Sequence, residues 1–386
     1  MAKWKYGKNG DDEYFSYDKI RRGKDKRRKN RSKDDGFVLS EDKWQDEEEW
    51  FRARVVEVHK RYAFVSPEAE DGSLATTDVW LATVARRHLQ SKRAERNSIV
   101  VGDWVQCRPA TEQDGEVSEE LPYCVMEQLA PRKSEIARVD PGSAERQHVL
   151  ASNVDQLLIV SSFRSPLVKW GLIDRYLVLA EEQKLEAVIV LNKYDLLEEE
   201  GEEAVQKAQT EIGIYRDLGY KVIVASLLGK PEAAVMAELE KALVNRTTIL
   251  SGHSGVGKSS LVNHFKPEIA QEVEPDADIF YKGRHTTTYA SLIKLSMGGY
   301  VVDTPGIRSF LLGERSAIEL SYAFREFRPF LGQCKYRECR HIDEPDCKVL
   351  EALQSGKITK RRYQSYKGLL LGDTGRQGRV RDDLID

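Results

Sequence analysis

One motif limits the fold of this 386-residue chain more than any other feature. The run GHSGVGKS fits the pattern G-x-x-x-x-G-K-[ST], in which a glycine-rich loop joins a strand to a helix. An apolar strand is predicted directly before it over Thr248–Leu250, and a helix directly after it over Ser260–Phe265. This context predicts a P-loop in an α/β domain. Its candidate phosphate-binding residues are Gly252, His253, Ser254, Gly255, Val256, Gly257, Lys258, Ser259 and Ser260.

The residue types of the predicted P-loop suit a nucleoside triphosphate. Glycines let backbone N–H groups approach the phosphates, and the N-terminal end of the next helix adds positive potential. Lys258 can reach the β- and γ-phosphate oxygens and is a catalytic candidate, while the Ser259 hydroxyl can bind Mg²⁺. A glycine turn that binds nothing is the alternative, and the flanking strand and helix disfavour it.

Two downstream segments complete a predicted magnesium and γ-phosphate site. Asp303 and Gly306 belong to a D-T-P-G run after the strand predicted over Tyr300–Val302. The carboxylate of Asp303 can hold Mg²⁺, and the N–H of Gly306 can meet the γ-phosphate. The run GRHTTT, which begins at Gly283, offers a hydroxyl that binds Mg²⁺ only while the γ-phosphate is present, as a switch loop does. We choose Thr287 as that ligand and as a catalytic candidate, although both neighbouring threonines offer the same group.

A further element indicates which base is bound. The run NKYD ends the strand predicted over Ala187–Leu191. The carboxylate of Asp195 can accept hydrogen bonds from both N1–H and the 2-amino group of guanine, and adenine lacks this pair of donors. Ser226 follows the next strand and marks a second loop whose backbone N–H groups meet guanine O6. The base-binding candidates are Asn192, Lys193, Tyr194, Asp195 and Ser226.

Strands and helices alternate around these motifs. Helical stretches are predicted over Asp174–Gln183 and Glu232–Leu243, between continuous apolar runs. This alternation predicts a parallel sheet with helical crossovers. The apolar runs are Gln156–Ser161, Ala187–Leu191, Val222–Ala225, Thr248–Leu250 and Tyr300–Val302.

The motifs occur in a permuted order. A Ras-like domain runs from the P-loop through the switch threonine and D-x-x-G to N-K-x-D and the serine loop. Here Asn192 and Ser226 precede Gly252, and Asp303 comes last. Joining the old termini and opening the chain between D-T-P-G and N-K-x-D preserves the same spatial site when the termini lie close together. The sequence therefore predicts a circularly permuted GTPase domain, whose switch after Gly306 leads into the C-terminal region.

A cysteine cluster near the C-terminus predicts a metal site. Of the five cysteines, three lie with a histidine in the pattern C-x4-C-x-H-x5-C. A Cys₃His set with short spacings favours one structural zinc ion, with iron–sulfur ligation and unrelated reduced thiols as alternatives. The predicted zinc ligands are Cys334, Cys339, His341 and Cys347. Residues without a partner pattern, expected in the core or on the surface, are Cys107, Cys124, His59, His88, His148 and His264.

The first 49 residues are strongly charged. Basic residues dominate from Lys19 to Lys33 and acidic ones from Asp34 to Glu49, without apolar periodicity, so residues 1–49 are predicted to be disordered. The basic part is either a solvated tail or an arm that neutralises RNA phosphates. A nuclear localisation signal is a third alternative.

Short strands predict a small β-barrel, an OB-fold, after this extension. The basic stretch Arg86–Arg96 lies between two of them and is either a nucleic-acid-binding loop or a charged surface helix. The strands are predicted over Arg52–Val65, Asp78–Ala82, Asp103–Arg108 and Tyr123–Leu129.

Composition restricts the cellular setting. The chain is 40% apolar and 32% charged, and no stretch approaches the roughly 18 apolar residues of a membrane span. The N-terminus lacks the apolar region of a secretory signal, so a cytoplasmic location without a membrane partner is expected. We also expect a monomer.

Together these motifs resemble the RsgA family, also called YjeQ, of ribosome small subunit-dependent GTPases. The likeness rests on GHSGVGKS, GRHTTT, DTPGIRSF and the cysteine-histidine run, and it covers about residues 50–365. It implies an OB-fold over residues 50–135, a permuted GTPase domain over 136–315 and a mainly helical zinc domain over 316–386. It further implies binding to the 30S subunit and its rRNA during late maturation, with hydrolysis of GTP to GDP that the subunit stimulates.

The residue after D-T-P-G bears on catalysis. It is Ile307, where Ras-like enzymes carry the glutamine that orients water, and the family shares this replacement, so unaided hydrolysis should be slow. His285 in the switch loop is the candidate to position water, and contact with RNA or solvent is its alternative role.

An rRNA-binding scaffold with GTP as a structural ligand is the alternative function of the whole protein. An ATP-using enzyme is disfavoured by Asn192 and Asp195.

Overall fold

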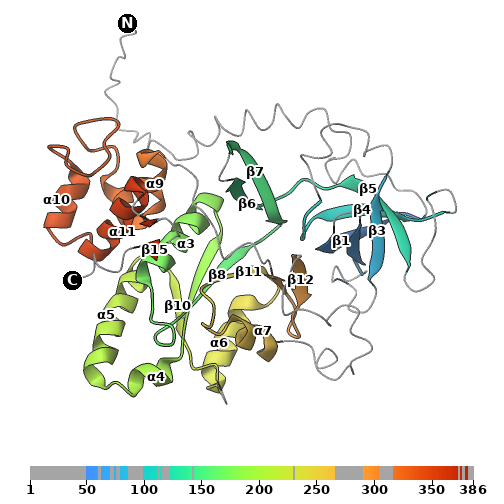
Figure 1. Ribbon diagram of the computed structural model, residues 1–386, viewed down its shortest axis with the longest axis horizontal. Coiled ribbons are helices and arrows are strands. Elements are labelled where there is room, and N and C mark those ends of the chain that lie inside the picture. The colour runs from blue at the N-terminus through green and yellow to red at the C-terminus, as the bar shows by residue number, and fades with distance from the viewer. Residues whose placement is uncertain are drawn as a thin grey trace, which may run out of the picture.

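The structure of the protein is a computed structural model (Figure 1). It describes residues 49–59, 62–69, 74, 79–85, 99–111, 114, 122–140, 143–228, 231–265, 290–303, 316–372, 374–375 and 379–380. The extension predicted over residues 1–49, apart from Glu49, and the basic stretch Arg86–Arg96 lie outside them. Within the described part of the chain, no helix has the length and apolar character needed to cross a membrane.

The N-terminal region is a closed five-stranded barrel. Its strands are hydrogen-bonded in the order β1-β2-β3-β5-β4, and a β1–β4 pairing closes the circle. The β3–β5 pair is parallel and the others are antiparallel. This is the predicted OB-type barrel, because alternate residues such as Ala53 and Val55 point into a common core. The strands are β1 (Phe51–Val58), β2 (Ala63–Pro67), β3 (Trp80–Val84), β4 (Trp104–Pro109) and β5 (Tyr123–Leu129).

The single strand predicted over Arg52–Val65 is wrong, because the chain turns back within it. It forms β1 and β2, which pair antiparallel from Ala53 opposite Pro67 to Val58 opposite Ala63. The intervening residues are polar and basic and include neither glycine nor proline, so no ordinary turn signal marks the hairpin. The register therefore depends on barrel closure rather than on local turn chemistry.

The central region is an α/β sheet with the order β10-β9-β8-β11-β13-β12. Every neighbouring pair is parallel except β12–β13, so the predicted parallel sheet has one antiparallel edge strand. At that edge β12 also pairs with β1 of the barrel, with Ser291 opposite Glu57. The strands are β8 (Gln156–Ser162), β9 (Glu186–Asn192), β10 (Lys221–Val224), β11 (Thr247–Ser251), β12 (Ser291–Lys294) and β13 (Tyr300–Asp303).

Helices cover both faces of this sheet, and each face has its own apolar core. Ile173 and Ile212 place α3 and α5 in one core, whereas Leu239 and Leu261 place α6 and α7 in the other. Strands buried on both faces explain the continuous apolar runs in the sequence. The helices are α3 (Trp170–Gln183), α4 (Tyr194–Glu198), α5 (Glu202–Asp217), α6 (Ala233–Leu243) and α7 (Lys258–His264).

A β-hairpin that the sequence analysis did not assign links the barrel to the α/β sheet. Its strands are β6 (Glu135–Asp140) and β7 (Ser143–Ser152). The end of β7 is tied to the barrel by a bridge between Ala151 and Val101. The sequence Pro141-Gly142 between the two strands is a turn signal that could have revealed the hairpin.

The C-terminal region is mainly helical, as predicted. A capping box between Ser316 and Glu319 begins α9. The apolar core of the C-terminal region contains Phe324, Phe327 and Tyr366, together with Val178 of α3. Figure 1 shows the barrel and these helices at opposite ends of the molecule, with the α/β sheet between them. The elements are α9 (Ala317–Ala323), the 3₁₀ helix η4 (Arg325–Phe330), α10 (Lys348–Gln354), α11 (Lys360–Leu371), β14 (Thr374–Gly375) and β15 (Arg379–Val380).

Candidate nucleotide and metal sites

The P-loop connects β11 to α7 and needs glycine at two positions. Gly252 has a φ of 144°, and a Cβ there would lie 2.0 Å from the carbonyl oxygen of Val160. Gly257 has a φ of 102°, and a Cβ there would lie 2.2 Å from Nδ2 of Asn192. Any side chain would therefore push the loop away from β8 or from the N-K-x-D run. The loop's conformation is fixed by its neighbours as well as by its own sequence.

The lysine of the P-loop lies over the loop itself. Its Nζ donates hydrogen bonds to the carbonyl oxygens of Gly252 and His253, at 2.8 and 2.6 Å. The next residue, Ser259, is exposed in the first turn of α7. An ammonium group and a hydroxyl thus lie together at the mouth of the loop, where phosphate oxygens and Mg²⁺ would be bound.

Asn192 joins the two predicted nucleotide-binding loops. The side chain is only 3% exposed, and its Nδ2 donates to the carbonyl oxygen of Val256 in the P-loop at 2.9 Å. Its Oδ1 accepts a hydrogen bond of 2.9 Å from the N–H of Leu227, next to Ser226. One buried amide therefore satisfies backbone groups of both loops, which fixes the distance between them.

The other predicted base-binding residues surround this amide. The N–H of Asp195 donates to the Ser226 hydroxyl at 3.0 Å, and the Asp195 side chain is exposed. Lys193, which has a positive φ of 61°, donates from Nζ to the carbonyl oxygen of Ser165. The N–H of Tyr194 donates to the carbonyl oxygen of Ala225. The run NKYD and the serine loop thus form one hydrogen-bonded unit that leaves the Asp195 carboxylate accessible.

The remaining predicted residues are only partly within the described chain. Asp303 is the last residue of β13, which pairs in parallel with β11, the strand that leads into the P-loop. Gly306, Ile307, His285 and Thr287 lie outside the described residues. The first residue of D-T-P-G therefore ends the strand next to the one that precedes the P-loop.

The candidate residues come together at one edge of the sheet. They follow the carboxyl ends of β9, β10, β11 and β13, where ligands bind in open parallel α/β sheets. The strand before the P-loop is central in space, with earlier strands on one side and later ones on the other. Among the described residues, the P-loop, the N-K-x-D run, the serine loop and Asp303 thus lie at one edge of the sheet.

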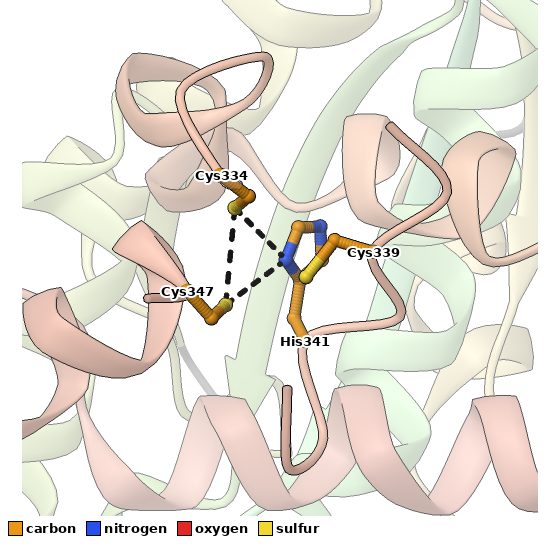
Figure 2. A group of neighbouring side chains, drawn as sticks. All are labelled: Cys334, Cys339, His341 and Cys347. Carbon is orange, nitrogen blue, oxygen red and sulfur yellow. Dashed lines mark hydrogen bonds between the residues drawn. The ribbon is translucent and has the colours of Figure 1, made fainter. Parts of the chain in front are cut away.

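The cysteine cluster brings four potential metal ligands together (Figure 2). All four ligand atoms lie within 4.8 Å of one another. The Sγ atoms of Cys334 and Cys347 are 3.8 Å apart, and Nδ1 of His341 lies 3.7 and 3.3 Å from them. Zinc bonded tetrahedrally to sulfur at 2.3 Å and nitrogen at 2.0–2.1 Å separates its ligand atoms by about 3.5–3.8 Å. The predicted ligand set therefore fits one zinc ion.

The surroundings of this cluster shift the pKa values of its candidate ligands in different directions. Burial raises the pKa of the Cys339 and Cys347 thiols, and burial lowers the pKa of His341. A neutral imidazole is ready to bind a cation, whereas the thiols must lose protons as the metal enters. Tyr363 and Tyr366 hold the histidine loop through hydrogen bonds of 2.8 Å to the carbonyl oxygens of His341 and Arg340.

The C-terminal region is attached to the α/β domain by a buried ion cluster that sequence analysis missed. Asp174 of α3 is 0% exposed and lies 2.6 Å from Arg362 and 2.9 Å from Arg361 of α11. Arg362 also binds Glu326 through two bonds of 2.6 and 3.0 Å. Burial alone would raise the pKa of Asp174, but the charges of Arg362 and Arg361 hold it below its ordinary value. No sequence pattern connects residues so distant in the chain.

The barrel is attached by a second buried arginine. Arg54 of β1 is 4% exposed, and its guanidinium donates to the Thr247 hydroxyl at 2.9 Å and to the carbonyl oxygen of Asn153 at 3.2 Å. The same group lies 5.2 Å from the ring centre of Tyr300. Thr247 and Tyr300 begin β11 and β13, so the strands that lead to the P-loop and to Asp303 share one contact with the barrel.

Together these features define a circularly permuted P-loop GTPase with an N-terminal OB-type barrel and a C-terminal Cys₃His region. The family model for the RsgA GTPase matches residues 129–313. A "Small ribosomal subunit biogenesis GTPase RsgA" from Actinobacillus pleuropneumoniae serotype 5b (strain L20) is 37% identical over 329 residues, which cover 85% of this chain and 87% of the relative. One of the same name from Haemophilus influenzae (strain PittGG) is 38% identical over 278 residues, covering 72% and 76%.

Solved structures agree with this relationship. The crystal structure of YjeQ from Thermotoga maritima has a TM-score of 0.62 and 30% identity, over 85% of this chain and 99% of that one. YloQ, described as a circularly permuted GTPase, has a TM-score of 0.62 and 26% identity, over 86% and 98%. This chain belongs to the RsgA GTPase family and is a GTPase of ribosome biogenesis. The family supports the predicted hydrolase and not the alternative of a scaffold without turnover.

Proposed function

We propose that the P-loop, Gly252–Ser260, binds the phosphates of GTP while the run Asn192–Asp195 and Ser226 bind guanine. The observation that carries this proposal is the buried amide of Asn192, which bonds to backbone groups of both loops. Phosphate and base subsites held by one side chain suit a ligand that contains both groups. The accessible carboxylate of Asp195 supplies the acceptor pair that guanine requires.

Ser259, Thr287 and Asp303 are proposed to hold Mg²⁺ with the nucleotide. The exposed Ser259 beside Lys258, and the position of Asp303 on the strand next to β11, support this assignment. Bound Mg²⁺ would neutralise charge on the β- and γ-phosphates. Gly306 is proposed to donate its N–H to the γ-phosphate, and GDP would remain after hydrolysis.

Catalysis is proposed to involve Lys258, Thr287 and His285. Lys258 would withdraw charge from the phosphate oxygens, and Thr287 would close the switch over the γ-phosphate. His285 would orient the attacking water, because Ile307 lacks the hydrogen-bonding groups of the Ras-like glutamine. Hydrolysis by the free protein would then be slow.

Cys334, Cys339, His341 and Cys347 are proposed to bind one structural zinc ion. The separations among the Cys334, His341 and Cys347 ligand atoms support zinc, and four protein ligands leave no open position for a catalytic water. Two of the cysteines belong to the C-terminal apolar core, so metal binding and folding of this region would be coupled.

The proposed partner is the 30S ribosomal subunit with its rRNA, in the cytoplasm. The name of the bacterial relatives supports this partner, and an OB-type barrel is a frequent nucleic-acid-binding fold. We propose a monomer with domains over residues 50–135, 136–315 and 316–386, preceded by a charged extension over residues 1–49. Hydrolysis stimulated by the subunit would make the protein a checkpoint of late assembly.

Co-sedimentation tests the proposed partner. Purified 30S or 50S subunits are mixed with the protein in GDP, GTP or a non-hydrolysable GTP analogue and then pelleted. We expect the protein to pellet with 30S subunits, most completely in the analogue, and to remain in solution with 50S subunits. Equal pelleting with both subunits, or pelleting that ignores the nucleotide, contradicts the proposal.

A further inference from the structure

The loop after β10 is hydrogen-bonded both to the N-K-x-D run and to the helix that follows the P-loop. The N–H of the buried Leu227 donates to Oδ1 of Asn192 at 2.9 Å. Its carbonyl oxygen accepts a hydrogen bond from Nε2 of His264, 3.1 Å away. His264 is the last residue of α7, the helix that begins at Lys258. The two backbone groups of Leu227 therefore bond to the N-K-x-D run on one side and to the end of the P-loop helix on the other.

These contacts close a ring through the nucleotide site. Asn192 also donates from Nδ2 to the carbonyl oxygen of Val256, at 2.9 Å, in the P-loop. The chain passes from Val256 into α7 and reaches His264 at the end of that helix. The ring runs from the P-loop through Asn192 and Leu227 to His264 and returns along α7. Movement of the base loop relative to the P-loop must break one of these bonds.

The position of this loop also determines the position of Asp195. The Ser226 hydroxyl, one residue before Leu227, accepts the N–H of Asp195 at 3.0 Å. Leu228, one residue after Leu227, is 85% exposed. Leu227 thus lies between Ser226, which is bonded to the backbone of Asp195, and Leu228, which is open to solvent.

We propose that His264 is a positioning residue for guanine recognition, which rests on the base site proposed above. By holding the carbonyl oxygen of Leu227, it fixes the serine loop, and through that loop Asp195, at the distance from the P-loop that a guanine nucleotide spans. The motifs GHSGVGKS, GRHTTT, DTPGIRSF and NKYD do not include this histidine. In the sequence it has no partner pattern, and only the fold brings it to Leu227.

The chemistry of the bond gives a sharp test. A carbonyl oxygen can only accept, so Nε2 of His264 carries the proton in this contact. A glutamine side chain can place its amide N–H near the position of Nε2. An asparagine places the same amide one methylene short of it. His264→Gln and His264→Asn therefore keep a polar amide at the helix end and differ in whether it reaches Leu227.

The experiment measures the affinity of the full-length protein and both variants for GDP and for IDP, which lacks the 2-amino group, by calorimetry. Loss of one such bond corresponds to about fivefold in an equilibrium constant. We expect His264→Asn to bind GDP about fivefold more weakly and to lose part of the preference for GDP over IDP. His264→Gln should stay within about twofold of the natural protein. The melting temperatures of the nucleotide-free variants should agree to within about 2–4 °C, because a single hydrogen bond contributes about 1 kcal/mol to folding.

Each outcome decides between the role of His264 and the base site itself. Equal GDP affinities for His264→Gln and His264→Asn overturn the role of His264, as does a loss that follows a lowered melting temperature. Asp195→Asn serves as the reference for a damaged base site. If the natural protein shows no preference for GDP over IDP and Asp195→Asn changes nothing, the proposed base site fails. If Asp195→Asn weakens GDP binding but His264→Gln and His264→Asn bind GDP equally well, only the inference about His264 fails.

Discussion

The metal centre and the nucleotide site of this protein are built in opposite ways. The four proposed metal ligands come from one short run, and their ligand atoms lie within 4.8 Å of one another. The nucleotide site takes its residues from four loops, and several of its working groups, such as Asp195 and Ser259, are exposed. The metal centre is closed inside a core, whereas the nucleotide site is an open edge of a sheet. A closed metal centre is suited to stabilise the fold, and an open nucleotide site is suited to exchange nucleotides.

The two regions also differ in how their charges are balanced. At the metal centre, burial raises the pKa values of the Cys339 and Cys347 thiols, so these groups must lose protons when a metal ion binds. In the nucleotide site, Lys258 is bound to carbonyl oxygens of its own loop, so a phosphate would exchange places with weak neutral acceptors. The metal centre should therefore depend on its ligand for folding, and the nucleotide site should keep its fold without one.

Removal of the metal should have the largest effect. Cys339→Ser, or treatment with a strong chelator, should unfold the C-terminal region, because structural zinc sites are worth about 10–16 kcal/mol in small domains. Limited proteolysis should cut beyond residue 316 and leave the nucleotide-binding region intact. Cys107→Ala, in the barrel core, is the matched control and should keep the protease pattern of the natural protein. Absence of zinc from purified protein by elemental analysis contradicts the ligand assignment.

The ion cluster between the two regions should give the next largest effect. Arg362→Met removes a partner of the buried Asp174 and Glu326, and breaking such a pair costs about 3–5 kcal/mol. Denaturant unfolding measures this loss of stability. Lys207→Met removes an exposed ion pair with Glu203 and should cost less than about 0.5 kcal/mol. Equal effects of the two substitutions contradict a structural role for the cluster.

The same ion cluster predicts how the stability of the protein changes with pH. The folded state lowers the pKa of Asp174, so its contribution to stability is complete above the pKa of the unfolded chain, about 3.9. That contribution is lost as the pH falls below this value toward the folded pKa. Arg362→Met should therefore narrow the stability difference between pH 7 and pH 3.

A change of base preference should be the smallest of these effects. Asp195→Asn replaces a carboxylate acceptor with an amide, which suits xanthine better than guanine. Loss of two hydrogen bonds to a charged group corresponds to about a hundredfold weaker GTP binding, with improved binding of XTP. Direct titration of both nucleotides provides the measurement. Unchanged GTP affinity would remove Asp195 from the base site while leaving the P-loop assignment intact.

Much of the candidate site could be predicted because its chemistry is local in sequence. The spacing of Gly252, Lys258 and Ser259 directly encodes a loop, and the short Cys₃His run directly encodes a ligand set. The barrel and the sheet followed from apolar patterning, which records burial on one or two faces. The order of the motifs alone indicated the permutation.

The unpredicted features depend on contacts between distant segments. Arg54, Asp174 and Arg362 look like ordinary charged residues in the sequence, and only the packing of one domain on another makes them buried partners. His264 gained its partner in the same way. The hairpin between β1 and β2 escaped prediction because its turn lacks glycine and proline. Sequence patterns identify groups that act with their neighbours in the chain, but not these long-range bonds.

Steady-state phosphate release with and without purified 30S subunits tests most directly whether the open nucleotide site is completed by the ribosome. The natural protein should hydrolyse GTP slowly alone and much faster with 30S subunits. His285→Ala should lose the stimulated rate while keeping GTP affinity and the basal rate, and Lys258→Ala should lose binding and both rates. Full stimulation of His285→Ala would exclude its proposed role. Stimulation by 50S subunits alone, or none by 30S subunits, would contradict the proposed assembly function.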